Sequence, residues 1–127
     1  QRLTNNKACF AMDTRRDFVY IDDMISCIMG AVDGKGKGTY HISSGADVSI
    51  KELFDATTAA LGMSIDVEVK DRQPDDVFSI LLDPSRTQAD FNWSVKVPLV
   101  EGVAKTIAYY QEYGIEETFT HLKAVNE

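Results

Sequence analysis

The chain has 127 residues, of which 44% are hydrophobic and 26% charged, values that suit one globular domain and argue against intrinsic disorder. Thirteen basic against twenty acidic residues give a net charge of −7, which argues against nucleic acid or an anionic membrane as a partner. No apolar run is long enough to span a bilayer. Because Cys9 and Cys27 lack a CxxC spacing, we expect reduced thiols and a cytoplasmic protein.

The first half of the sequence alternates between strand and helix patterns. Three short segments with apolar, aromatic or β-branched residues predict strands: 8–12, 17–21 and 39–42. An apolar stripe at helical spacing predicts a helix over residues 23–33, capped by Asp22 or Asp23 and ended by Gly34. The glycine-lysine run at 34–38 precedes a predicted strand, which favours a mobile turn over a phosphate-binding loop.

The second half continues in the same way. Ser49 and Glu52 have the spacing of a capping box and predict a helix that ends at Gly62. Alternating residues predict a strand at 65–69, and Asp83 with Pro84 predicts a cap and first turn for a helix reaching about residue 90. Three further predictions complete the chain: a helix from Pro98 to Gly114, a frayed tail over 115–127, and a single partial α/β domain over 1–127.

Several segments, taken in order, also resemble motifs of one enzyme family, the extended short-chain dehydrogenases/reductases. The matching segments are Arg15–Asp23, Thr39–Gly45, Val48–Leu53, Arg72–Val77, Asp83–Trp93 and Leu99–Tyr110. The resemblance covers about residues 7–114 and implies the NAD-dependent nucleotide-sugar epimerases and dehydratases. It implies that the chain is the carboxy-terminal, substrate-binding lobe of such an enzyme, a small mixed α/β unit with the Rossmann cofactor domain absent.

The catalytic elements of that family are absent from the sequence. No glycines stand at the G-x-x-G-x-x-G spacing that brings backbone amides against a dinucleotide pyrophosphate. No tyrosine is followed four residues later by a lysine, so the pair that moves the proton is missing. His41 and His121 lack partners at metal-ligand spacing. We therefore expect no catalytic residue, cofactor or metal in this chain, and NAD or NADP in the parent protein.

The resemblance implies a nucleotide-diphospho sugar as the partner. It places Arg16 and Arg72 on the diphosphate, where guanidinium groups bind phosphate oxygens with two hydrogen bonds. It places Asp75 on a ribose hydroxyl, Phe18 near the phosphates and Phe10 along the base. From composition alone, Arg15 and Arg16 are more often solvated charges beside a strand, and Arg72 is equally compatible with a surface ion pair.

Two other interpretations stay open: a free-standing, non-catalytic nucleotide-sugar-binding or interaction module, and an unrelated acidic α/β domain. The resemblance also implies that residues 17–32 pack against the cofactor domain of the parent. Without that domain their apolar side chains would be exposed, which favours association. We therefore expect a homo-oligomer formed through this region.

Overall fold

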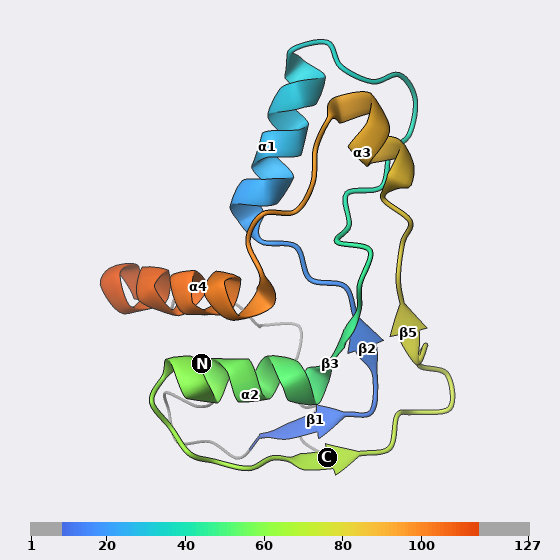
Figure 1. Cartoon of the computed structure of the whole chain (residues 1–127). Helices are drawn as coiled ribbons and strands as arrows, with labels where there is room; N and C mark the ends of the chain where they lie inside the picture. Colours follow the sequence, from blue (N-terminus) through green and yellow to red (C-terminus); the bar gives the residue numbers. More distant parts are fainter. Residues whose placement is uncertain (1–8, 115–127) are drawn as a thin grey trace.

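A computed structural model describes residues 9–114 as four helices and five short strands (Figure 1). The strands form two small sheets. In the first, β1 (Phe10–Met12) runs parallel to β4 (Glu68–Lys70). In the second, β2 (Arg15–Arg16) lies between β3 (Val48–Ser49), which is antiparallel to it, and β5 (Ser79–Ile80), which is parallel to it. The predicted mixed α/β class is confirmed.

Helix α2 (Ile50–Ala60) packs between β1 and α4 (Leu99–Tyr113), as Figure 1 shows. It begins with the predicted capping box. Ser49 Oγ accepts a hydrogen bond from the Glu52 amide at 3.0 Å, and the Ser49 amide donates to Glu52 Oε2 at 2.7 Å. The predicted last helix is also confirmed, since α4 follows Pro98 and ends at Gly114.

Helix α1 (Ile21–Val32) lies beside α3 (Ser85–Phe91) and encloses a small core with it. This core is formed by Cys27, Phe91 and Trp93. The indole Nε1 of Trp93 donates to the carbonyl oxygen of Asp23 at 2.9 Å, which joins the segment before α4 to the first turn of α1. The Asp23 carboxylate is buried and accepts from the amides of Lys96 and Val97 at 3.1 and 2.9 Å.

Two predicted strands are wrong. Residues 17–20 are extended but unpaired with any strand in the described part of the chain, and α1 begins immediately after them, with Tyr20 as its N-cap. Residues 39–42 likewise make no ladder there, because side chains bind their carbonyl groups instead. Thr87 Oγ1 donates to the His41 carbonyl oxygen at 2.6 Å, and Arg86 Nη1 donates to that of Thr39 at 3.1 Å.

Other boundaries shift by a few residues. The strand predicted at 65–69 is β4, at 68–70. Helix α3 begins one residue later than expected, after Pro84, and Asp83 still serves its first turn by accepting a hydrogen bond from the Ser85 amide at 2.9 Å. Neither Asp22 nor Asp23 caps α1 with its side chain. The predicted tail, 115–127, lies outside the described residues.

Hydrogen bonds and a packing contact hold the 34–38 turn against the rest of the molecule. Lys35 Nζ donates to the Phe91 carbonyl oxygen at 3.0 Å, and the Lys37 amide donates to Tyr40 Oη at 2.9 Å. Gly36 lies directly against the Phe91 ring, where a Cβ atom would come within 2.4 Å of a ring carbon. Only glycine fits here, because the backbone also has a positive φ of 74°.

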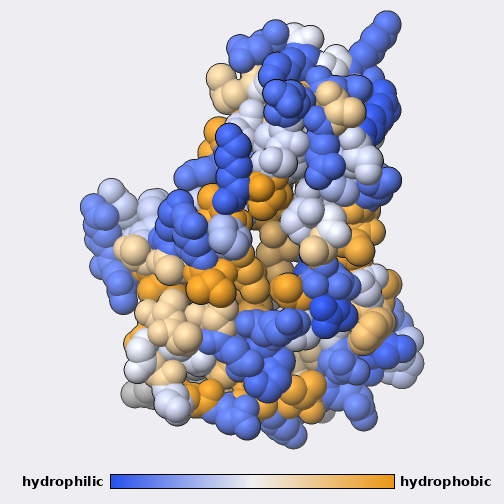
Figure 2. All heavy atoms as spheres, in the orientation of Figure 1, coloured by the Kyte–Doolittle hydropathy of each residue, from blue (hydrophilic) through white to orange (hydrophobic). Residues whose placement is uncertain are grey.

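Hydrophobic side chains remain exposed along α1. They lie on its outward face and are between 37% and 71% exposed: Ile21, Met24, Ile25, Ile28, Met29 and Val32. Figure 2 shows hydrophobic residues gathered across the middle of the molecule and hydrophilic ones over the end that carries the 34–38 turn. Within residues 9–114, no helix has the length and apolar character that crossing a membrane requires.

Candidate functional site

Strand β2 positions Arg16, the first of the predicted binding residues. Its backbone pairs with Val48 on one side and Ile80 on the other, and its side chain reaches the chain segment just before β5. Nη1 donates to the carbonyl oxygens of Arg15 and Val77 at 2.7 and 2.9 Å. Nη2 forms an ion pair with Asp76 Oδ1 at 3.0 Å, and the Arg16 side chain is 26% exposed.

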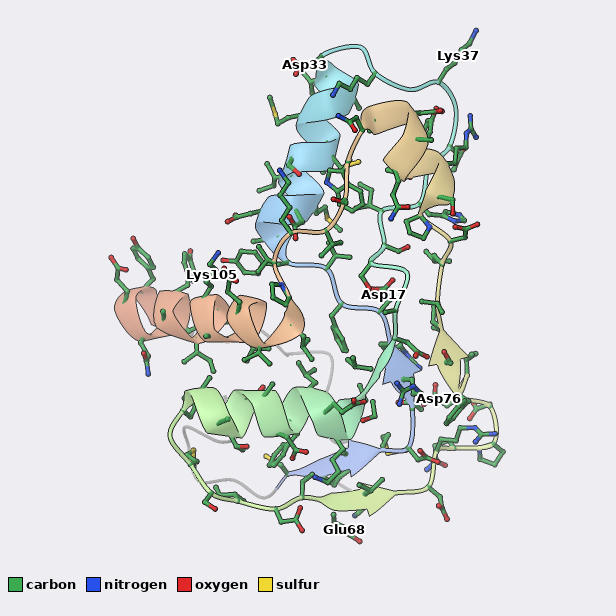
Figure 3. All side chains as sticks on the ribbon, in the orientation of Figure 1. Asp17, Asp33, Lys37, Glu68, Asp76 and Lys105 are labelled. Carbon is green, nitrogen blue, oxygen red and sulfur yellow. The ribbon has the colours of Figure 1, made fainter. Side chains whose placement is uncertain are left out.

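Arg72 approaches the same segment from its other end. Its guanidinium carbon lies 5.5 Å from the centre of the Phe78 ring, a cation–π contact, and its side chain is otherwise exposed. The two predicted arginines thus flank residues 76–78. Asp75 lies in the turn between them and is exposed. The acidic partner of Arg16 is Asp76, the residue that follows Asp75, and Figure 3 shows it beside β2 and β5.

The two predicted aromatic contacts lie at different places. Phe18 follows β2 and is 37% exposed. Phe10 lies on β1, in the other sheet, where Lys70 Nζ is 4.6 Å from its ring centre. The structure therefore groups Arg16, Arg72 and Asp75 around one segment and places Phe10 on a different sheet from Arg16.

A small hollow adjoins Arg16. It encloses about 120 Å³ and is lined by Arg16, Asp17, Val19, Ile42, Ser43, Ile80 and Leu82. A volume of this size holds a few water molecules, well below the several hundred cubic ångströms of a typical small-molecule pocket.

A polar network behind β2 was not predicted from the sequence. Arg15 Nε donates to Asp47 Oδ1 at 3.1 Å, and Nη2 donates to the carbonyl oxygen of the same residue at 2.9 Å. The Ser79 hydroxyl donates to the other carboxylate oxygen of Asp47, which links β5 to the loop before β3. These bonds lower the pKa of Asp47, the Ser79 bond contributing most and Arg15 next. The partners are 32 positions apart, so no local pattern pointed to them.

Asp17, next to Arg16, binds the turn at residues 44–45. Its carboxylate accepts hydrogen bonds from the Ser44 hydroxyl at 2.6 Å and from the Ser44 and Gly45 amides at 2.9 and 3.3 Å (Figure 3). Arg15, Arg16 and Asp17 thus reach three different parts of the chain: Arg15 binds Asp47, Arg16 binds residues 76 and 77, and Asp17 binds residues 44 and 45. Among residues 9–114, no group of three or more His, Cys, Asp or Glu side chains is placed to hold a metal ion.

Comparisons with known proteins give the class of protein that this fold represents. The Bordetella bronchiseptica enzyme WbmH, whose crystal structure contains NAD+, is 49% identical, with a TM-score of 0.83 over 91% of this chain and 39% of that one. WbmG from the same organism, in complex with NAD and UDP, is 35% identical, with a TM-score of 0.84 over 97% of this chain and 41% of that one. Both are NAD-bound enzymes.

The sequence comparisons narrow the class to a family. A family model described as GDP-mannose 4,6 dehydratase matches residues 3–106. UDP-glucose 4-epimerase of Mycolicibacterium smegmatis is 29% identical over 97 residues, which are 76% of this chain and 31% of the relative. Probable GDP-L-fucose synthase 1 of Oryza sativa subsp. japonica is 31% identical over 98 residues, 76% of this chain and 30% of the relative. The chain belongs to the extended short-chain dehydrogenase/reductase family of nucleotide-sugar epimerases and dehydratases.

The extent of these matches corrects one prediction. The chain spans about a third of the length of the curated relatives and about two fifths of the solved ones. A match at residues 3–106 that covers this share fits the amino-terminal, NAD-binding region of such enzymes. The prediction that the chain is the carboxy-terminal portion of such an enzyme is therefore wrong. What the comparisons show is that the chain belongs to the family.

Proposed function

We propose that this chain holds the nucleotide diphosphate of a sugar nucleotide within an NAD(P)-dependent epimerase or dehydratase, and that it is not catalytic by itself. The observation that carries the proposal is the convergence of two arginines on one segment. Arg16 binds the carbonyl of Val77 at 2.9 Å, and Arg72 lies 5.5 Å from the ring of Phe78. Two guanidinium groups beside the same segment can both bind the oxygen atoms of one diphosphate.

One solved relative supports a nucleotide as the ligand. WbmG, which aligns with 97% of this chain, is in complex with UDP. In this proposal Asp75 accepts hydrogen bonds from ribose hydroxyls, Phe18 lies near the phosphates, and Phe10 contacts the base from the neighbouring sheet.

The second candidate is a free-standing, non-catalytic nucleotide-sugar-binding or interaction module. The sequence feature that favours it is the absence of both the glycine fingerprint and the Tyr-x-x-x-Lys pair from these 127 residues. The two candidates differ in affinity. A module evolved to bind alone would bind a sugar nucleotide tightly, whereas a part of a larger enzyme would offer an incomplete site.

Calorimetric titration of the 127-residue chain with UDP-, dTDP-, CDP- and GDP-sugars tests the proposal. We expect at least one of them to bind weakly, as an incomplete site should, and Arg16→Ala and Arg72→Ala each to weaken that binding about tenfold or more, since hydrogen bonds to charged groups contribute about 1.5–3 kcal/mol each. Tight binding would favour the second candidate. Lys37→Ala is the control, because Lys37 is an exposed cation on the remote turn. If Lys37→Ala weakened nucleotide binding as much as the two arginine variants do, their effect would be nonspecific electrostatic attraction.

A parallel titration with NAD tests the other possible role of the chain. NAD shares a diphosphate with the sugar nucleotides, so weak competition between the two is compatible with the proposal. Binding of NAD that is unaffected by Arg16→Ala, together with no binding of any sugar nucleotide, would contradict it and assign the chain to the cofactor-binding part.

A further inference from the structure

We propose that Asp47 is a positioning residue for the nucleotide site: by binding β2 and β5 at once, it fixes the register between the two strands, and that register sets where Arg16 and Arg72 lie. The inference rests on the proposed function, since both arginines belong to the site proposed above. Asp47 acts through the sheet and makes no contact with the ligand in this proposal.

The backbone pairing between β2 and β5 is short. It consists of two residue pairs, Arg15 with Ser79 and Arg16 with Ile80. A strand that slips by one residue moves by about 3.3 Å and turns each of its side chains to the opposite face of the sheet. Because two pairs of residues resist such a slip poorly, we expect side-chain contacts to hold the register.

Asp47 supplies these contacts. Arg15 and Ser79 are register partners, and both of their side chains donate to the Asp47 carboxylate. The main-chain carbonyl oxygen of Asp47 accepts a further hydrogen bond from Arg15 Nη2 at 2.9 Å. The Asp47 side chain is only 19% exposed, so water competes little for these bonds. One residue therefore binds both strands at the same level of the sheet.

The opposite face of the sheet carries the proposed ligand contacts. Side chains alternate along a strand, so Arg16 points away from Arg15, and its Nη1 donates to the Val77 carbonyl oxygen at 2.9 Å. Arg72 lies against the ring of Phe78, the next residue along the chain. Both contacted residues directly precede β5, so a slip of β5 relative to β2 would move them away from their guanidinium partners.

Calorimetric titration of the 127-residue chain with UDP tests the inference, with Asp47→Asn as the variant. Asparagine keeps the size of the side chain but places an NH2 group against one of its two donors, Arg15 and Ser79. Losing a negative charge should by itself strengthen the binding of an anion. We expect the opposite, binding about threefold weaker or more, because groups in one hydrogen-bond network are coupled by amounts of this order.

Two further variants separate positioning from a loss of stability. Ser79→Ala removes the bond from β5 without changing the charge, and it should also weaken the binding of UDP. Asp23→Asn is the matched control, because its carboxylate is buried and accepts two amide hydrogen bonds, but it joins α1 to the segment before α4. It should lower the stability of the fold and leave the binding of UDP unweakened.

The outcomes distinguish this inference from the proposed function. If Arg16→Ala weakens the binding of UDP but Asp47→Asn and Ser79→Ala do not, the positioning role is refuted and the nucleotide site stands. Equal weakening by Asp23→Asn would also refute it, because a general loss of stability would then explain the effect. If the unmodified chain binds no UDP, both proposals fail. Circular dichroism checks that each variant is folded, and Ser79→Ala decides the test if Asp47→Asn does not fold.

Discussion

Arg15 binds Asp47 twice, through its carboxylate at 3.1 Å and through its main-chain carbonyl at 2.9 Å. Arg15 lies on β2 and Asp47 immediately precedes β3, so the pair holds the two antiparallel strands together from the side. Ser79 on β5 donates to the same carboxylate. One aspartate therefore connects all three strands of the sheet that carries Arg16, whose side chain faces the opposite way.

Acid should weaken this sheet through Asp47. Its pKa in the folded protein is lowered by the Ser79 hydroxyl and by Arg15, and that of Glu52 is lowered by its bonds to Ser49. A lowered folded-state pKa stabilises the fold fully above the unfolded-state pKa, which is about 3.9 for aspartate, and the stabilisation is lost as pH falls through the folded-state value. We expect urea unfolding to show stability decreasing below about pH 5.

The variant Asp47→Asn identifies the source of this pH dependence. It should be less stable than the unmodified chain at neutral pH, and the difference should narrow as the pH falls, because the unmodified chain loses the same charge. Asp71→Asn, at an exposed position, should leave the pH profile unchanged. A constant difference between Asp47→Asn and the unmodified chain from about pH 7 to about pH 3 would show that the charge of Asp47 is not responsible.

A buried carboxylate at the start of α1 should matter more for stability than its exposed neighbour. The Asp23 carboxylate accepts from the amides of Lys96 and Val97, and alanine would leave both without their acceptor. We expect Asp23→Ala to lower the free energy of unfolding by about 1–3 kcal/mol. Asp22→Ala removes an exposed carboxylate from the same turn and should change it by less than about 0.5 kcal/mol. Chemical denaturation measures the free energy of unfolding of both variants. Equal losses would contradict a stabilising role for the hydrogen bonds that the Asp23 carboxylate accepts.

The successes and errors of sequence-based prediction follow from the range of the interactions involved. The capping box of Ser49 and Glu52 is confirmed because both partners lie within one turn of helix. The strands predicted at 17–21 and 39–42 are wrong because distant side chains decide those segments. Asp17 binds residues 27 and 28 positions away, and Thr87 binds His41 across 46 positions.

The same limit applies to the candidate site. Arg16, Arg72 and Asp75 were identified by motif order, and their roles stay predictions. Which acidic residue pairs with Arg16 depends on a contact across 60 positions, and the turn after Pro74 directs Asp76 toward it. Sequence alone cannot distinguish the neighbours Asp75 and Asp76 at this point, because they are adjacent carboxylates in the same turn.

Gly36 should tolerate no side chain. A Cβ atom there would lie 2.4 and 2.6 Å from two carbons of the Phe91 ring, and the backbone φ is +74°. We expect Gly36→Ala to cost about 2–4 kcal/mol, from overpacking together with the left-handed backbone. Gly34→Ala is the matched control, since its φ is +87° but nothing lies within 4 Å, so only the backbone cost of about 1 kcal/mol remains. Thermal unfolding measures the two variants, and equal costs would show that the Phe91 contact is unimportant.

The exposed face of α1 should cause the purified chain to self-associate. Ile25 and Ile28 are each 48% exposed on this face, and in a sample that contains only this chain a second copy is the partner available to cover them. We expect a dimer by light scattering, and Ile25→Ser with Ile28→Ser should weaken it about tenfold or more through lost apolar burial. Val100→Ser, at an exposed apolar position on α4, is the control. A monomer at all concentrations that binds no hydrophobic dye would contradict this prediction, because the face would then be neither paired nor available.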